Sequence, residues 1–187
     1  LSLRDNNTVA RKTPRQLIEV MDEALAEGAC KHITLTTGTP TTDDKGIKAY
    51  SGIVEALKAV HPNLPVQVQF EPPKTMVTMD ELQRAGVDPV GIHIESFDRG
   101  VLRRTCPGKS RTVAEEYLES WRYATELFGE GQVSTYIIAG LGEDDDNIIS
   151  ASRLLANLGV IPYVVPLRPI SGASMENVDP PSTDRMM

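Results

Sequence analysis

Polar residues that could take part in chemistry stand just after short apolar, β-branched runs of the sequence. One run ends in the loop TTGTP (36–40), where the glycine lets the backbone approach a ligand and the hydroxyls supply donors and acceptors. Another run, GIHIES (91–96), places His93 and Glu95 on one face of the strand it predicts. A carboxylate at the end of a strand can hold a pair of ribose hydroxyls or an ammonium group. The simpler alternatives are a plain turn at 36–40 and a structural role for the histidine.

Two later loops carry further charged residues. The basic stretch RRTCPGK (103–109) is either a solvated surface loop or a clamp for a carboxylate. The stretch AGLGEDDD (139–146) has two glycines before a predicted helix with an acidic first turn, which the helix dipole favours. We interpret the acidic run as capping, because its aspartates do not alternate as a calcium loop requires. The glycines lack the third member of a dinucleotide-binding fingerprint.

Alternating strands and helices must position these loops. Short apolar runs predict buried strands over residues 32–37, 66–70, 90–94, 133–138 and 163–167. Helical spacing predicts helices over residues 13–27, 45–60, 79–85, 112–128 and 145–158. This order indicates right-handed βαβ units and a parallel sheet. Parallel sheets and barrels bind ligands at the carboxyl ends of their strands, where the polar loops fall.

Length and composition limit the classes of protein that the chain fits. The 187 residues predict one domain, 1–187, with an irregular, proline-rich tail over 177–187. A net charge of −7 argues against nucleic-acid and membrane-surface partners and favours small molecules. No apolar run reaches the roughly 18 residues of a membrane span, and the first residues do not form a signal peptide, so we expect a cytoplasmic protein. The two cysteines, Cys30 and Cys106, match no metal-ligand spacing and are expected to be ordinary thiols.

The longest motifs resemble a known family. GIHIESFDRGVLRRTCPGKS (91–110), a helix, and then STYIIAGLGEDDDN (134–147) resemble the fourth-strand and fifth-strand region of radical S-adenosylmethionine (SAM) enzymes, especially the biotin-synthase-like branch. ITLTTGTP (33–40) is similar to the family's second strand with its Gly-Gly-Glu-like loop, and VVPLRPISGAS (164–174) to its sixth strand. The resemblance implies an α/β fold, a partial parallel (β/α)6 TIM-like barrel with strands two to six of the radical SAM core.

The resemblance also implies a SAM site at the strand ends. The residues that it places around SAM are Thr37, Gly38, Thr39, Glu95, Ser96, Ile138, Gly140, Glu143 and Arg168. The first three would bind the methionyl amino group, the next two would lie near the ribose and methionyl part, and the next three near the adenine. Arg168 would face the substrate or the SAM carboxylate. The chain departs from the family where Tyr136 replaces a glycine and Thr39 replaces a glutamate, so the amino contact would fall to backbone carbonyls and hydroxyls.

The family's Cys-x-x-x-Cys-x-x-Cys motif is absent from these residues. Three thiolates hold a [4Fe–4S] cluster, and Cys30 and Cys106 cannot replace them. We expect the cluster ligands upstream of Leu1; the alternative is a cluster-free relative.

By resemblance, the complete protein would cleave SAM reductively to a 5′-deoxyadenosyl radical that acts on an unknown small molecule. A reductase, flavodoxin or ferredoxin would donate the electron. One alternative is a non-catalytic barrel that binds SAM or another small ligand. Another is a metal- or phosphate-dependent lyase or aldolase, which would want a lysine or a set of metal ligands at the strand ends, and no predicted strand offers a lysine.

Overall fold

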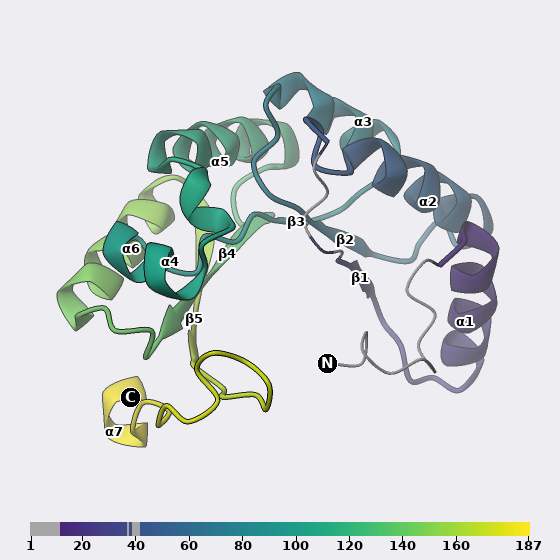
Figure 1. Ribbon diagram of the computed structural model, residues 1–187. Coiled ribbons are helices and arrows are strands. Elements are labelled where there is room, and N and C mark those ends of the chain that lie inside the picture. Colours follow the sequence, from purple (N-terminus) through teal and green to yellow (C-terminus); the bar gives the residue numbers. More distant parts are fainter. Residues whose placement is uncertain (1–11, 37, 39–41) are drawn as a thin grey trace. The chain divides into compact units, whose positions relative to one another are not determined.

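The computed structural model of the chain describes residues 12–36, 38 and 42–187 (Figure 1). The length predicts one domain; contacts in the structure group the chain into two compact units, Leu1–Pro89 and Val90–Met187. Each unit is described by itself. Within the described residues, none of the helices is long and apolar enough to cross a bilayer.

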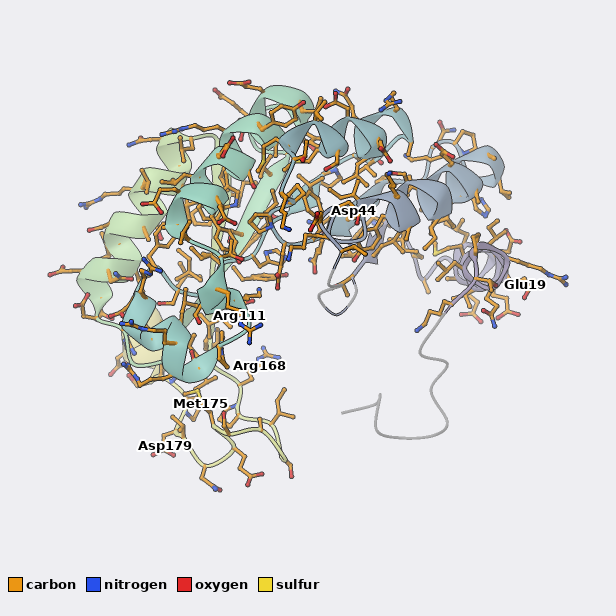
Figure 2. All side chains as sticks on the ribbon, turned by 45° about the horizontal axis from the view of Figure 1, so that its top comes forward. Glu19, Asp44, Arg111, Arg168, Met175 and Asp179 are labelled. Carbon is orange, nitrogen blue, oxygen red and sulfur yellow. The ribbon has the colours of Figure 1, made fainter. Side chains whose placement is uncertain are left out.

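The first unit is built of short βα repeats. Its elements in chain order are α1 (Pro14–Ala26), β1 (Ile33–Leu35), α2 (Ile47–Val60), β2 (Val66–Gln69), η2 (Met76–Thr78) and α3 (Met79–Arg84). Thr13 caps α1 in a reciprocal pair: its hydroxyl accepts the Gln16 N–H, and the Gln16 side chain accepts the Thr13 N–H at 2.8 Å. At the start of α2, a carboxylate oxygen of Asp44 accepts the N–H of Lys48 (Figure 2).

Strands β1 and β2 pair in parallel, with Ile33 opposite Val66. Val66 and Val68 are fully buried, whereas the alternating glutamines of β2 are partly exposed, which is the two-residue period of a strand. The carboxylate of Asp88 accepts the Val66 N–H and pairs with Lys58 of α2, both at 2.8 Å. The predicted helices and strands of this region are confirmed, although β1 leaves out residues 32 and 36 of the predicted run 32–37, whose last residue lies outside the described ranges.

The second unit carries three parallel strands in chain order. Its elements are β3 (Val90–Gly91), α4 (Arg99–Thr105), η3 (Lys109–Arg111), α5 (Ala114–Phe128), β4 (Val133–Ala139), α6 (Asp145–Asn157), β5 (Val160–Pro166) and α7 (Thr183–Met186). Four predictions need correction. The third strand stops at Gly91 and not at residue 94, and β5 begins at Val160 and not at residue 163. Helix α4 lies where a basic loop was expected to begin, and the tail 177–187 contains the short helix α7.

Helices cover one face of this sheet. Val133, Thr135 and Ile137 of β4 are buried on the face that contacts α5, while Tyr136 and Ile138 point the other way and are partly exposed. Strand β5 lies beside β4 in the same sheet. Tyr163 of β5 is the residue opposite Tyr136, so the two tyrosines lie on the same face. Figure 1 shows α5 and α6 on the same side of these strands. The opposite face is therefore the one on which a ligand can lie.

A buried tryptophan fixes α5 beneath β3. Trp121 is fully buried, and its indole N–H donates to the carbonyl of Ile92 at 3.0 Å. Its ring packs against Phe97 and Tyr117, with centroid distances of 5.8 and 5.5 Å. The burial of this ring and the hydrogen bond of its indole N–H thus fix the chain just before His93.

Candidate functional site

A β-bulge follows strand β3. Gly91 pairs with Ser134, an offset of 43 residues (134 − 91). Further along, Glu95 pairs with Ile137, an offset of only 42 (137 − 95). One extra residue therefore lies on the β3 side between these pairs, which is the definition of a bulge. Bulges re-aim side chains beside functional sites, and this one precedes the carboxylate that the sequence singled out.

At the bulge, the imidazole of His93 accepts a backbone hydrogen bond that a carbonyl would accept in a regular strand. Its Nδ1 accepts the N–H of Tyr136 at 3.1 Å, so the neutral ring carries its proton on Nε2. That Nε2 atom is buried and has no hydrogen-bond partner among the described residues. Burial, aided by the positive charge of Lys109, lowers the pKa of His93 to about 4. The ring also packs on Tyr136 with a centroid distance of 4.3 Å.

Glu95 occupies an unusual backbone conformation at the end of the bulge. Its φ of 72° lies in the left-handed region, which costs a residue with a Cβ about 1 kcal/mol. Two ladder hydrogen bonds hold it there: its N–H donates to Tyr136 at 3.1 Å and its carbonyl accepts from Ile138 at 2.8 Å. The surrounding backbone thus imposes the conformation, and with it the direction of the side chain.

Lys109 holds the carboxylate of Glu95. The two form an ion pair in which the side chains are 23% and 17% exposed, and the same ammonium donates to the His93 carbonyl at 2.8 Å. Of the two interpretations of the basic loop, the clamp for a carboxylate fits this lysine, although the carboxylate belongs to the protein itself. The sequence did not identify the pair, because Lys109 lies beyond a helix that was not predicted.

The loop after β4 is shaped by a buried glutamate. The side chain of Glu143 is 1% exposed, and its two oxygens accept the N–H groups of Gly140 and Leu141 at 2.8 and 2.9 Å. Asp144 caps α6 by accepting the Asn147 N–H at 2.6 Å, which confirms that the acidic run is capping. The carboxylate of Glu143 is therefore bonded to the loop backbone.

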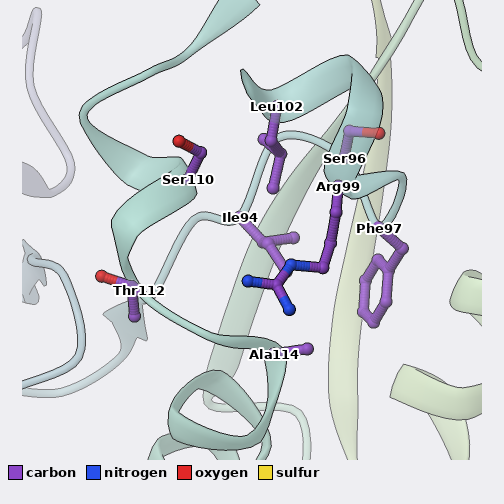
Figure 3. Close-up of a pocket in the computed structure, with 8 residues that line it drawn as sticks. All are labelled: Ile94, Ser96, Phe97, Arg99, Leu102, Ser110, Thr112 and Ala114. Atoms are coloured by element: carbon purple, nitrogen blue, oxygen red, sulfur yellow. The ribbon is translucent and has the colours of Figure 1, made fainter. Parts of the chain in front are cut away.

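The loop between β3 and α4 uses its polar groups internally. The buried Ser96 hydroxyl accepts the N–H of Asp98 at 3.1 Å. Asp98 caps α4, and the N–H of Val101 that it accepts lowers the pKa of its carboxyl below the usual range. Figure 3 shows a small pocket beside this loop, into which the guanidinium of Arg99 points. This guanidinium has no carboxylate partner within the described ranges, so it gives the pocket a positive charge.

The remaining sequence-predicted residues lie at other strand ends. Gly38 is exposed in the first unit, and its neighbours Thr37 and Thr39 lie outside the described residues. Arg168 is exposed two residues after β5 (Figure 2). Within the second unit, the structure brings Glu95 into direct contact with Ile138, whose strand leads into the Gly140–Glu143 loop.

The thiols offer no cluster site in this chain. Cys30 donates to the His32 carbonyl at 3.0 Å, Cys106 accepts from Thr105 at 3.6 Å, and both cysteines are free. The part of the chain that the structure describes holds no group of three or more potential metal ligands. With two cysteines in 187 residues, these residues do not fit a [4Fe–4S] cluster held by three thiolates.

Comparison with known proteins identifies the family. Residues 4–155 match the model of the radical SAM superfamily, and the chain belongs to this superfamily. It is 27% identical over 132 residues to bacteriochlorophyllide c C-7(1)-hydroxylase of Chlorobaculum limnaeum, an alignment that covers 70% of this chain and 32% of that protein. The chain thus spans about a third of the curated relative that it matches.

Two solved structures show the same fold. The hydrogenase maturase HydG from Carboxydothermus hydrogenoformans superposes with a TM-score of 0.73 at 16% identity, over 97% of this chain and 43% of HydG. The methyltransferase TsrM from Kitasatospora setae, solved with cobalamin and a [4Fe–4S] cluster, gives a TM-score of 0.61 at 15% identity, over 89% of this chain and 33% of TsrM.

These findings confirm the α/β fold and the partial TIM-like barrel of the radical SAM type. The superfamily is one of enzymes that use SAM and a [4Fe–4S] cluster, and residues 4–155 match its domain. The biotin-synthase-like branch is not singled out by the comparisons and stays a prediction.

Proposed function

We propose that the protein containing this chain cleaves SAM reductively and uses the resulting 5′-deoxyadenosyl radical on a small organic molecule. The observation that carries the proposal is the family match over residues 4–155. The same match makes a non-catalytic binding module the less favoured alternative. The cluster ligands would come from outside these residues, because the chain has only two cysteines.

The second unit would supply the ribose and adenine contacts of SAM. Glu95, aimed by the bulge and held by Lys109, is the proposed partner of the ribose or methionyl groups, together with Ser96. Ile138 would pack against the adenine, and the backbone of the loop from Gly140 to Leu141 would contact its edge. Glu143 contributes by shaping that backbone, since its oxygens are already bonded to it.

The other predicted contacts come from the family resemblance alone. Thr37, Gly38 and Thr39 would meet the methionyl amino group, and Arg168 would bind the SAM carboxylate or an anionic group of the substrate. The electron donor in this proposal is a reductase, a flavodoxin or a ferredoxin, and the protein is cytoplasmic.

We further propose a flat, conjugated substrate. The helix-free face of the second unit carries a run of rings in which Tyr136 lies between His93 and Tyr163, the latter at a centroid distance of 5.9 Å. Tyr163 is 48% exposed, so its ring offers a stacking surface. The curated relative is named for a bacteriochlorophyllide, a molecule with a flat conjugated ring system.

Anaerobic reconstitution of the full-length protein with iron and sulfide tests the enzymatic proposal. With SAM and dithionite, the reconstituted protein should release 5′-deoxyadenosine, detected by mass spectrometry. The 187-residue chain, treated in the same way, should show neither iron–sulfur absorbance nor cleavage. Full-length protein that binds no iron, or that binds SAM without cleaving it, would overturn the proposal and support the non-catalytic alternative.

A further inference from the structure

The C-terminal segment, defined here as residues 180–187, returns to the loop that follows β4. Its short helix α7 is capped by Ser182, which accepts the N–H of Arg185 at 3.2 Å. Figure 1 shows α7 beyond the carboxyl end of β5. The family model ends at residue 155, so family membership assigns no role to this segment.

Arg185 binds the carboxylate that shapes the loop. Its Nη2 lies 3.1 Å from Oε1 of Glu143 and 3.2 Å from the carbonyl oxygen of the same residue. Oε1 is also the oxygen that accepts the Gly140 N–H at 2.8 Å. One carboxylate oxygen therefore joins the tail to the loop backbone.

Electrostatics favour this arrangement. A carboxylate that is 1% exposed needs compensating partners, and Arg185 supplies the cationic one. A hydrogen bond to Asp145, at 2.8 Å, and the charges of Asp145 and Glu143 raise the pKa of Arg185 further, so the guanidinium stays charged. Removing it would leave Glu143 buried without a counter-charge.

Packing adds a second connection between the segment and the loop. Gly140 has a φ of 103°, and a Cβ built there would lie 3.0 Å from Cδ of Pro181 and 3.2 Å from Cβ of Leu167. Pro181 thus packs directly on the glycine. Charge at Arg185 and close contact at Pro181 restrain the same few residues of backbone.

We infer that Arg185 is a positioning residue for SAM binding. Through Glu143, and together with Pro181, it holds the backbone of Gly140 and Leu141 in the shape that meets the adenine. This inference rests on the proposed function, in which that backbone contacts SAM. Arg185 would act through the loop and not by contact with a reacting atom.

Titration of the reconstituted full-length protein with SAM tests the inference. Arg185→Gln should raise the Kd for SAM about tenfold, while kcat at saturating SAM stays within about twofold. Arg185→Lys keeps the charge but loses the fork that bonds Glu143 and Asp145 together, so the Kd should rise only about threefold. The matched control is Arg15→Gln, which breaks an exposed pair with Glu19 and should leave the Kd unchanged.

Hydrogen exchange of the SAM-free protein provides a second readout. The amides of Gly140 and Leu141 should exchange faster in Arg185→Gln than in the wild type or in Arg15→Gln. If the wild type binds no SAM, the proposed function fails, and the exchange rates alone decide whether Arg185 holds the loop. If the wild-type protein binds SAM and the Arg185→Gln variant binds it with the same Kd, the inference is overturned. If Arg185→Gln does not fold, Arg185→Lys decides: an unchanged Kd overturns the inference and a raised Kd supports it.

Discussion

Tyr136 donates its backbone N–H to the Nδ1 atom of His93 at 3.1 Å, so that a side chain stands where a regular ladder would have a carbonyl. The contact needs the neutral imidazole, because a protonated ring cannot accept this hydrogen bond. The bulge that aims Glu95 therefore depends on the protonation state of a single histidine.

The free energy of unfolding should decrease as the pH falls, because of His93. The unfolded chain takes up the proton near pH 6.5 and the folded chain only near pH 4. The unfolded state binds more protons between these values, so the free energy of unfolding decreases as pH falls through that window, by about 3 kcal/mol. Urea unfolding at both ends of the window measures the loss. His93→Asn, whose amide oxygen can accept the same N–H, should flatten the dependence; an unchanged slope would refute the assignment.

Glu95→Ala should weaken SAM binding about tenfold in the full-length protein and leave the iron–sulfur spectrum intact, because Glu95 belongs to the proposed SAM pocket and not to a cluster loop. Equilibrium titration with SAM and an absorbance spectrum on the same sample provide the two measurements. Simultaneous loss of the spectrum would show that the change disturbs the cluster instead.

Lys109→Gln should also weaken SAM binding, though less than Glu95→Ala, because it leaves the Glu95 carboxylate in place without its cation. Lys74→Gln is the matched control, since its pair with Asp43 has side chains that are 72% and 73% exposed. A double-mutant cycle between Glu95 and Lys109 measures the coupling free energy of the two side chains in SAM binding. Additive effects would mean that the lysine does not orient the carboxylate.

Gly140→Ala should destabilise the protein by about 1–3 kcal/mol, because it adds a Cβ at positive φ and against Pro181. Gly52→Ala, in the middle of α2 with no atom within 4 Å of the added Cβ, should instead stabilise by about 0.5–1 kcal/mol. Thermal or chemical unfolding of both variants distinguishes the two cases. Equal effects would contradict the packing of the tail on this glycine.

Tyr163→Leu should reduce binding of a flat conjugated ligand several-fold, about 1 kcal/mol for one lost stacking contact, whereas Tyr163→Phe should not. A water-soluble porphyrin, followed by its absorbance, serves as the probe. Equal binding by both variants would remove the support for a planar substrate.

The sequence predicts the strands and helices well where apolar residues set the pattern. Strand β4 and helix α6 lie close to where alternation and capping placed them. Helix α4 was missed because its arginines suggested a solvated loop, although Asp98 stands at its start as a capping residue. Strand β3 ends early because the ring of His93 replaces a backbone acceptor, and no alternation pattern encodes such a bulge.

The candidate site could be predicted only in part, because the roles of its residues depend on partners distant in the sequence. The position of Glu143 after two glycines marks it as a candidate, but its carboxylate accepts hydrogen bonds from the loop backbone. Arg185, which forms the ion pair with it, lies 42 residues further on. That tail has no apolar period and gave no signal. Glu95 was found by position alone; its ion pair with Lys109 required the fold of α4 and η3.

The burial of Trp121 has a practical consequence for spectroscopy. It is the sole tryptophan in the 187 residues, and it lies in the second unit with its indole bonded to the residue just before His93. Under excitation that is selective for tryptophan, the chain therefore has one fluorophore, which lies beside the bulge and not in the first unit. Emission intensity and wavelength will follow the opening of the bulge and of the helix under it, while circular dichroism follows both units. A difference between the two signals during unfolding would separate the halves of the chain without any label.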